Sequence, residues 1–146
     1  MSAKEAVPDL IKRALNALES RDLDTVMKCF ADDAVLYDPH YPYAEMHGKT
    51  EIREGLEWAN AGMKSMSFTP LRFFTSDDGA SCFIELDTHH VPKAGGELEF
   101  AQVFVVDTKD GAITSMRSYL PHGPNGFGGF MLRTMHRGFR RKHPRK

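Results

Sequence analysis

The sequence of 146 residues has few cysteines and no long hydrophobic run. Its two cysteines, Cys29 and Cys82, stand alone without a Cys-x-x-Cys spacing, so no disulfide framework is expected. No apolar stretch approaches the length of a membrane-spanning helix, and the first residues lack the pattern of a signal peptide. No spacing of the His-Glu-x-x-His type occurs, and we predict neither a metal nor a cofactor. These absences predict a soluble, cytoplasmic protein without a membrane partner.

Acidic residues are missing from the C-terminal stretch, residues 121–146, which carries seven Lys and Arg. The preceding residues carry 12 Lys and Arg against 20 Asp and Glu, so an acidic body precedes a basic tail. Basic tails can bind nucleic acid, but the acidic body would repel a polyanion, and we predict no nucleic-acid partner. The boundaries we expect are a domain at 1–121 and a tail at 122–146. The apolar tail residues Phe127, Phe130 and Met131 are predicted to pack on the pocket mouth or a partner subunit.

The N-terminal half has the apolar period of helices. Residues that share one helical face are Val7, Leu10, Ile11, Ala14, Leu15 and Leu18. Similar spacing at 23–30 and 50–63 predicts two further helices. Thr50 is expected to cap the third helix.

The second half alternates with the period of strands at 67–76, 80–91, 97–107 and 112–120, joined by short turns. Such strands should form an antiparallel meander. Three helices on one face of this strongly curved sheet predict an α+β cone open at one end. The apolar residues expected on the other face are Phe83, Val103, Val105, Ile113 and Tyr119. An exposed apolar face of this kind predicts a homodimer.

Asp38 is the most unusual charged residue, because it ends a short apolar strand and is followed by Pro39 and His40. One interpretation is that Asp38 only caps a turn, since Asp-Pro commonly opens turns. The other is that its carboxylate borders an apolar cavity, where a raised pKa would let it act as a base near neutral pH.

Several segments together resemble a known family. They are Arg-Asp-Leu-Asp at 21–24, Phe-Ala-Asp-Asp-Ala at 30–34, Asp-Pro at 38–39, Gly-Lys-Thr-Glu-Ile-Arg-Glu at 48–54 and Ser-Met-Arg at 115–117. Over roughly residues 5–120 the chain resembles bacterial ketosteroid isomerase and, more broadly, the SnoaL-like branch of the nuclear transport factor 2-like superfamily. This fold hosts isomerases, cyclases, dehydratases, hydrolases and proteins without catalytic activity.

The resemblance implies a role for Asp38 and two departures from the isomerase. Asp38 falls on the position of the isomerase's general base. Ala14 stands where that enzyme has an oxyanion-hole tyrosine, and Gln102 stands where it has an oxyanion-hole aspartic acid. Gln102 can still donate a hydrogen bond, whereas Ala14 cannot.

Histidines are the remaining candidates for catalysis. His40 lies in the loop at the expected pocket mouth. Of the neighbours His89 and His90, only one can face the pocket. His90 shares the more apolar face, but Thr88-His89 resembles a pair common in SnoaL-like strands, so both stay open.

The sequence therefore predicts a cofactor-free isomerase, cyclase or lyase acting on a small, largely apolar carbonyl compound. The expected catalytic residues are Asp38, Gln102, His90, His89 and His40. The expected substrate-binding residues are Ala14, Leu18, Trp58, Met63, Ile84, Leu86, Phe100, Phe104, Met116 and Leu120. The alternative is a domain of the same fold that binds a small molecule or a protein without catalysis.

Overall fold

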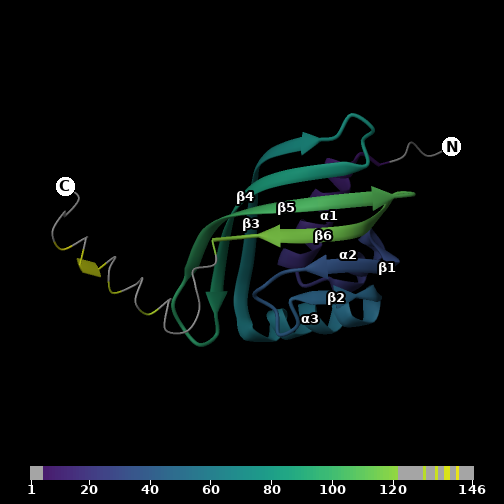
Figure 1. The fold of residues 1–146 in the computed structure, drawn as a ribbon. Helices are drawn as coiled ribbons and strands as arrows, with labels where there is room; N and C mark the ends of the chain where they lie inside the picture. Colours follow the sequence, from purple (N-terminus) through teal and green to yellow (C-terminus); the bar gives the residue numbers. More distant parts are fainter. Residues whose placement is uncertain (1–4, 122–129, 131–133, 135–136, 139–140, 142–146) are drawn as a thin grey trace.

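The computed structural model describes residues 5–121 and residues 130, 134, 137, 138 and 141. Within residues 5–121, the helices are α1 (Val7–Glu19), α2 (Leu23–Cys29) and α3 (Gly48–Gly62). The strands are β1 (Phe30–Tyr37), β2 (Glu45–His47), β3 (Met63–Thr75), β4 (Ser81–Pro92), β5 (Leu98–Lys109) and β6 (Ala112–Tyr119). In Figure 1, α1 and α2 lie behind the sheet, α3 lies along its lower edge beside β2, and the long strands bend.

All strands join one sheet in the order β2-β1-β6-β5-β4-β3. Among the described strands, β1 and β6 pair in parallel and every other neighbouring pair is antiparallel. The predicted α+β cone with a β3–β6 meander is confirmed. The short strand β2 was not expected, because its three residues lie inside a segment without strand periodicity.

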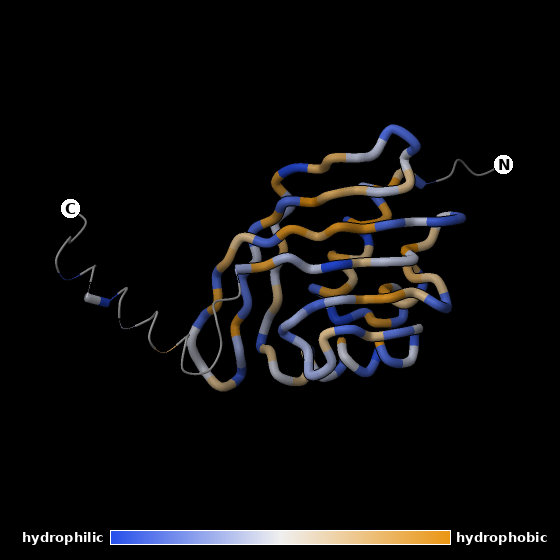
Figure 2. Tube along the Cα trace, in the orientation of Figure 1, coloured by the Kyte–Doolittle hydropathy of each residue, from blue (hydrophilic) through white to orange (hydrophobic). Residues whose placement is uncertain are grey.

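The core lies between the helices and the sheet. Pro8 lies in the first turn of helix α1, where a backbone N–H would have no partner within the helix, so its missing N–H costs nothing. The helix then buries Leu10, Ile11, Ala14 and Leu15, four members of the predicted stripe. On the sheet side, the buried residues of β4 and β5 alternate along each strand. Figure 2 shows hydrophobic residues along the central strands and hydrophilic residues at the turns.

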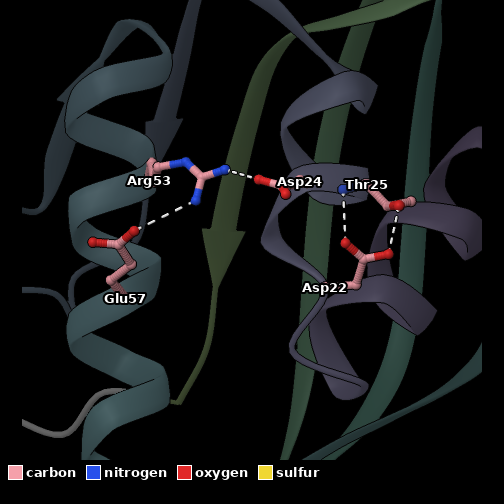
Figure 3. A network of polar contacts seen from close by, with 5 residues as sticks. All are labelled: Asp22, Asp24, Thr25, Arg53 and Glu57. Atoms are coloured by element: carbon pink, nitrogen blue, oxygen red, sulfur yellow. Dashed lines mark hydrogen bonds and ion pairs between the residues drawn. The ribbon is translucent and has the colours of Figure 1, made fainter.

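Polar contacts fix the helices relative to one another (Figure 3). The Asp22 carboxylate caps α2 by accepting hydrogen bonds from the Thr25 backbone N–H at 3.0 Å and its hydroxyl at 2.6 Å. Arg53 of α3 forms an ion pair with Asp24 of α2 and another with Glu57. These contacts hold α3 beside α2.

The expected cap of the third helix was wrong. Helix α3 begins at Gly48, so Thr50 lies inside its first turn and His47 is the N-cap. The Glu51 carboxylate supplies the missing partner by accepting a hydrogen bond from the His47 backbone N–H at 2.7 Å. The contact is like one half of a capping box, but it comes from the fourth helical residue and not the third.

The expected outer face also needs one correction. Ile113 is fully buried in the core, although Phe83 and Tyr119 are exposed as expected. The pairing of β5 with β6 shifts between Asp107 and Thr108, which adds one residue to β6. This irregularity breaks the alternation, so Ile113 and Met116 both face inward despite their spacing of three.

The predicted packing of Phe127 and Met131 lies outside the described residues. The side chain of Phe130 is described and is exposed. Within the described part of the chain, every helix is too short or too polar to cross a membrane.

Candidate functional site

A cavity of about 300 Å³ lies between the helices and the inner face of the sheet. Most of its lining is apolar or aromatic, and all three helices contribute. The lining residues beyond those expected from the sequence are Leu15, Val26, Phe30, Leu36, Tyr41, Leu56, Ala59, Met66, Phe68 and Leu98. A cavity of this size and composition suits a small, largely apolar ligand.

Most of the expected substrate-binding residues line this cavity. They are Ala14, Leu18, Trp58, Met63, Phe100, Phe104 and Met116. Ile84 and Leu86 are completely buried members of the hydrophobic core and do not border the cavity. Leu120 follows the end of β6 and is also absent from the lining. The inward orientation of a strand residue therefore does not tell whether that residue lines the cavity or belongs to the hydrophobic core.

Among the described residues, Asp38 is the only acidic one in the cavity lining. It follows the last residue of β1, and only 9% of its surface is exposed. Its Oδ1 accepts a hydrogen bond from the His40 backbone N–H at 2.9 Å. Its backbone carbonyl accepts one from the Tyr41 N–H at 3.2 Å, and its own N–H donates to Ala44 at 2.8 Å. The loop thus holds the carboxylate firmly at the cavity wall.

Burial raises the pKa of the Asp38 carboxyl above its ordinary value. The His40 backbone N–H, the charge of His40, the Ser118 hydroxyl and the charge of His90 act in the opposite direction, but burial is the largest effect. A carboxylate in this state is a stronger base than an exposed aspartate.

His90 enters the cavity, where its ring lies edge-on to Phe68 at 5.4 Å and to Phe100 at 5.8 Å. Its Nδ1 lies 3.1 Å from the His89 carbonyl oxygen, which can only accept, so Nδ1 carries a hydrogen. Burial lowers the pKa of His90, which favours the neutral ring with an unprotonated Nε2. His90 therefore offers an acceptor to the cavity.

The other two candidate histidines take different positions. His40 lines the cavity, with its ring edge-on to Phe100 at 5.7 Å. His89 does not line it, and its Nε2 lies 3.1 Å from a Glu97 carboxylate oxygen. The side chains of His89, Glu97 and Glu99 also lie close enough together to hold a cation between them. However, both glutamates are exposed, and exposed acidic groups commonly lie together without an ion.

Gln102 lines the cavity but pairs with its neighbours in the sheet. Its Oε1 accepts a hydrogen bond from the Thr88 hydroxyl at 2.7 Å, and its Nε2 donates to the Ser118 hydroxyl oxygen. All three residues are buried. The sequence reasoning missed Ser118, because no local pattern marks it.

Tyr41 lines the cavity and carries a polar group that the sequence reasoning did not select. Its ring centroid lies 6.0 Å from that of Trp58. Burial raises the pKa of its phenol, and the nearby charge of Asp38 adds to the effect, so the phenol keeps its hydrogen. Among the described residues, none forms a hydrogen bond with the phenol oxygen. The only sequence signal was its position three residues after Asp38.

Comparisons with known proteins agree with this geometry. The model of the SnoaL-like domain family matches residues 11–116 of this chain. No curated protein matches the sequence. An NTF2-like protein of unknown function from Burkholderia pseudomallei K96243 has a similar structure, with a TM-score of 0.73, 17% identity and coverage of 88% of this chain and 96% of that one.

Two further solved structures have a similar fold. A Mycobacterium tuberculosis protein in complex with estradiol-17β-hemisuccinate has a TM-score of 0.70 at 20% identity, covering 78% of this chain and 92% of that one. A putative polyketide cyclase from Xanthomonas campestris pv. campestris has a TM-score of 0.67 at 17% identity, covering 80% and 90%. At these identities the structures show a shared fold alone, but the family model covers most of the chain. The protein therefore belongs to the SnoaL-like domain family.

Proposed function

We propose that this protein is a cofactor-free enzyme of the isomerase, cyclase or lyase type that acts on a small, largely apolar carbonyl compound. Asp38 is its general base. The observation that carries the proposal is a single buried carboxylate, fixed by the His40 backbone N–H, at the wall of an apolar cavity.

In the proposed reaction, Asp38 takes a proton from the carbon next to the substrate carbonyl. The electron pair of the broken C–H bond moves toward the carbonyl oxygen and forms an enolate. The carboxylic acid of Asp38 then returns the proton, to another carbon in an isomerisation. Attack of the enolate on a second group, or loss of a leaving group, gives a cyclisation or an elimination instead.

The developing negative charge on oxygen needs a hydrogen-bond donor. The Tyr41 phenol is the donor in this proposal, because it stays protonated in the cavity and has no partner among the described residues. The role expected for Gln102 passes to Tyr41, since the Gln102 amide already pairs with Thr88 and Ser118. His90 would serve as a second proton acceptor through its unprotonated Nε2.

The structural neighbours support a ligand of this class. One is bound to a steroid derivative, and another is a putative polyketide cyclase. Steroids and polyketides are both largely apolar and carry oxygen-containing groups, which suits the lining of the cavity.

The alternative is that the cavity binds such a molecule without transforming it. Ala14 favours this reading, because the resembled isomerase has its oxyanion-hole tyrosine there. The two functions differ in whether a bound ketone exchanges protons with Asp38.

Proton exchange tests the proposal without knowledge of the natural substrate. Cyclohex-3-enone in D₂O serves as the probe, with deuterium incorporation and formation of the conjugated enone followed by NMR. The wild-type protein should accelerate both, and Asp38→Asn should reduce the rate about 10²–10⁴-fold. Asp33→Asn is the matched control, because Asp33 lies in β1, the strand that Asp38 follows, but is exposed. Binding of the probe without exchange would favour the alternative function.

A further inference from the structure

Three buried polar side chains, Thr88, Gln102 and Ser118, have no part in the reaction as described above. We propose that Gln102 is a positioning residue: held by Thr88, it fixes the Ser118 hydroxyl so that the hydrogen of that hydroxyl points at the Asp38 carboxylate. The four residues form a relay that runs from Thr88 through Gln102 and Ser118 to Asp38.

The direction of the relay follows from its donors and acceptors. The Thr88 hydroxyl donates to Gln102 Oε1 at 2.7 Å, which turns the amide nitrogen toward Ser118. An amide nitrogen can only donate, so the Ser118 oxygen accepts the hydrogen bond from Gln102 Nε2. The hydrogen of the Ser118 hydroxyl is then free to point at the neighbouring Asp38, whose pKa the Ser118 side chain lowers.

The sheet register explains why these residues meet. Parallel pairing sets Tyr37 opposite Arg117, so the next residues, Asp38 and Ser118, adjoin. Antiparallel pairing sets Ser118 opposite Phe104, which places Gln102 as its diagonal neighbour on the inner face. The relay therefore crosses the adjacent strands β4, β5 and β6 and ends at the residue that follows β1.

Burial gives the relay its effect. Thr88, Gln102 and Ser118 are exposed by only 2%, 4% and 1%, so water cannot readily replace a lost partner. The hydrogen bond from Ser118 lowers the pKa of Asp38 against the larger effect of burial. The relay thus keeps the carboxylate in one rotamer and in its ionised, basic form. The effect of the relay on a reaction rate rests on the proposed role of Asp38 as a base. The hydrogen bonds of the relay do not depend on that role.

NMR titration of the Asp38 carboxyl carbon tests the relay directly, in the full chain and without substrate. The signal is assigned by its loss in Asp38→Asn. Ser118→Ala and Gln102→Met should each raise the pKa of Asp38 by about one unit, because one hydrogen bond to the charged form is lost. Thr88→Val should raise it less, since it acts two links away. Ser115→Ala, in the same strand but outside the relay and the cavity lining, is the control and should leave the pKa unchanged.

The double variant Ser118→Ala/Gln102→Met tests whether Gln102 acts through Ser118. The proposal requires that the second change adds nothing to the first. It is overturned if Ser118→Ala or Gln102→Met titrates like the control, or if the effects of the two changes add. If Ser118→Ala fails to fold, Thr88→Val decides, because valine keeps the shape and removes the hydroxyl: an unchanged pKa overturns the relay. Raised pKa values together with an absence of proton exchange would support the relay and reject the proposed reaction, so the two failures are distinguishable.

Discussion

The carboxylate of Asp38 accepts a hydrogen bond from the backbone N–H of His40, two residues ahead, at 2.9 Å. This is the contact of an Asx-turn, and it is made by the same side chain that borders the cavity. The two interpretations of Asp38 that the sequence left open are therefore compatible. The turn anchors the carboxylate at the cavity wall, where burial raises its pKa.

Asp38→Asn is expected to stabilise the fold at neutral pH. The pKa of Asp38 is higher in the folded than in the unfolded chain, so protonated Asp38 favours the folded state. This contribution to stability is fully present below pH 3.8, the ordinary pKa of an aspartate, and is lost as the pH rises through the pKa of Asp38 in the folded chain. Asparagine mimics the protonated form and avoids that loss. Urea unfolding at several pH values measures the difference, which should be large at pH 7 and vanish below pH 3.8. A variant that is less stable than wild type at pH 7 would contradict this reading of the burial.

Gly55→Ala is expected to disturb the cavity loop from within α3. A Cβ atom at Gly55 would lie 2.3 Å from Met46 Sδ and 3.2 Å from Tyr41 Cδ1, and Met46 is buried. Overpacking of this kind costs about 1–3 kcal/mol, more than the roughly 1 kcal/mol that alanine contributes in a helix. Denaturant unfolding should show a net loss of stability. Gly62→Ala is the control, because a Cβ atom there meets nothing within 4 Å; equal effects at the two positions would refute the explanation.

Arg21→Ala is expected to loosen the junction between α3 and β3. The Arg21 guanidinium donates to the carbonyl oxygens of Asn60 at 3.1 Å and of Met63 and Lys64 at 2.7 Å each. Loss of these charged hydrogen bonds should cost about 1.5–3 kcal/mol of unfolding free energy. Arg13→Ala, which breaks an exposed pair with Glu5, should cost about 0–1 kcal/mol in the same assay. Similar losses in both variants would show that the carbonyl contacts add nothing.

A symmetric homodimer is expected through the outer face of the sheet. Phe74 and Phe83 are cross-strand neighbours there, and both are about half exposed at 56% and 49%. Light scattering at micromolar concentration should give the dimer mass, and Phe83→Asp should shift it to the monomer. A wild-type monomer at that concentration would reject the dimer.

Particular residues show how much of the fold could be predicted from the sequence. Alternation along β4 correctly placed Ile84 and Thr88 inward and Phe83 outward, because β4 pairs with β5 in unbroken register there. The same reasoning failed at Ile113, where the pairing with β5 shifts. Periodicity describes each strand alone, and an irregularity depends on the neighbouring strand.

The site was predictable where a residue carries its own signal. Asp38 did so, as a charge at the end of an apolar strand. Ser118 did not, because its meaning arises from the parallel pairing of β1 with β6, whose residues are far apart in sequence. Tyr41 lies in a segment without periodicity, so nothing in the chain indicated which way its phenol points.

The central claim is that Asp38 acts as the base in the cavity, and the pH dependence of deuterium incorporation into cyclohex-3-enone tests it most directly. The wild-type rate should fall as the pH drops through a single ionisation above 3.8, because burial raises the pKa of the base and its protonated form is inactive. Asp38→Asn should remove this ionisation and most of the rate, while Asp33→Asn keeps both. A wild-type rate that persists in Asp38→Asn with the same pH profile would contradict the account.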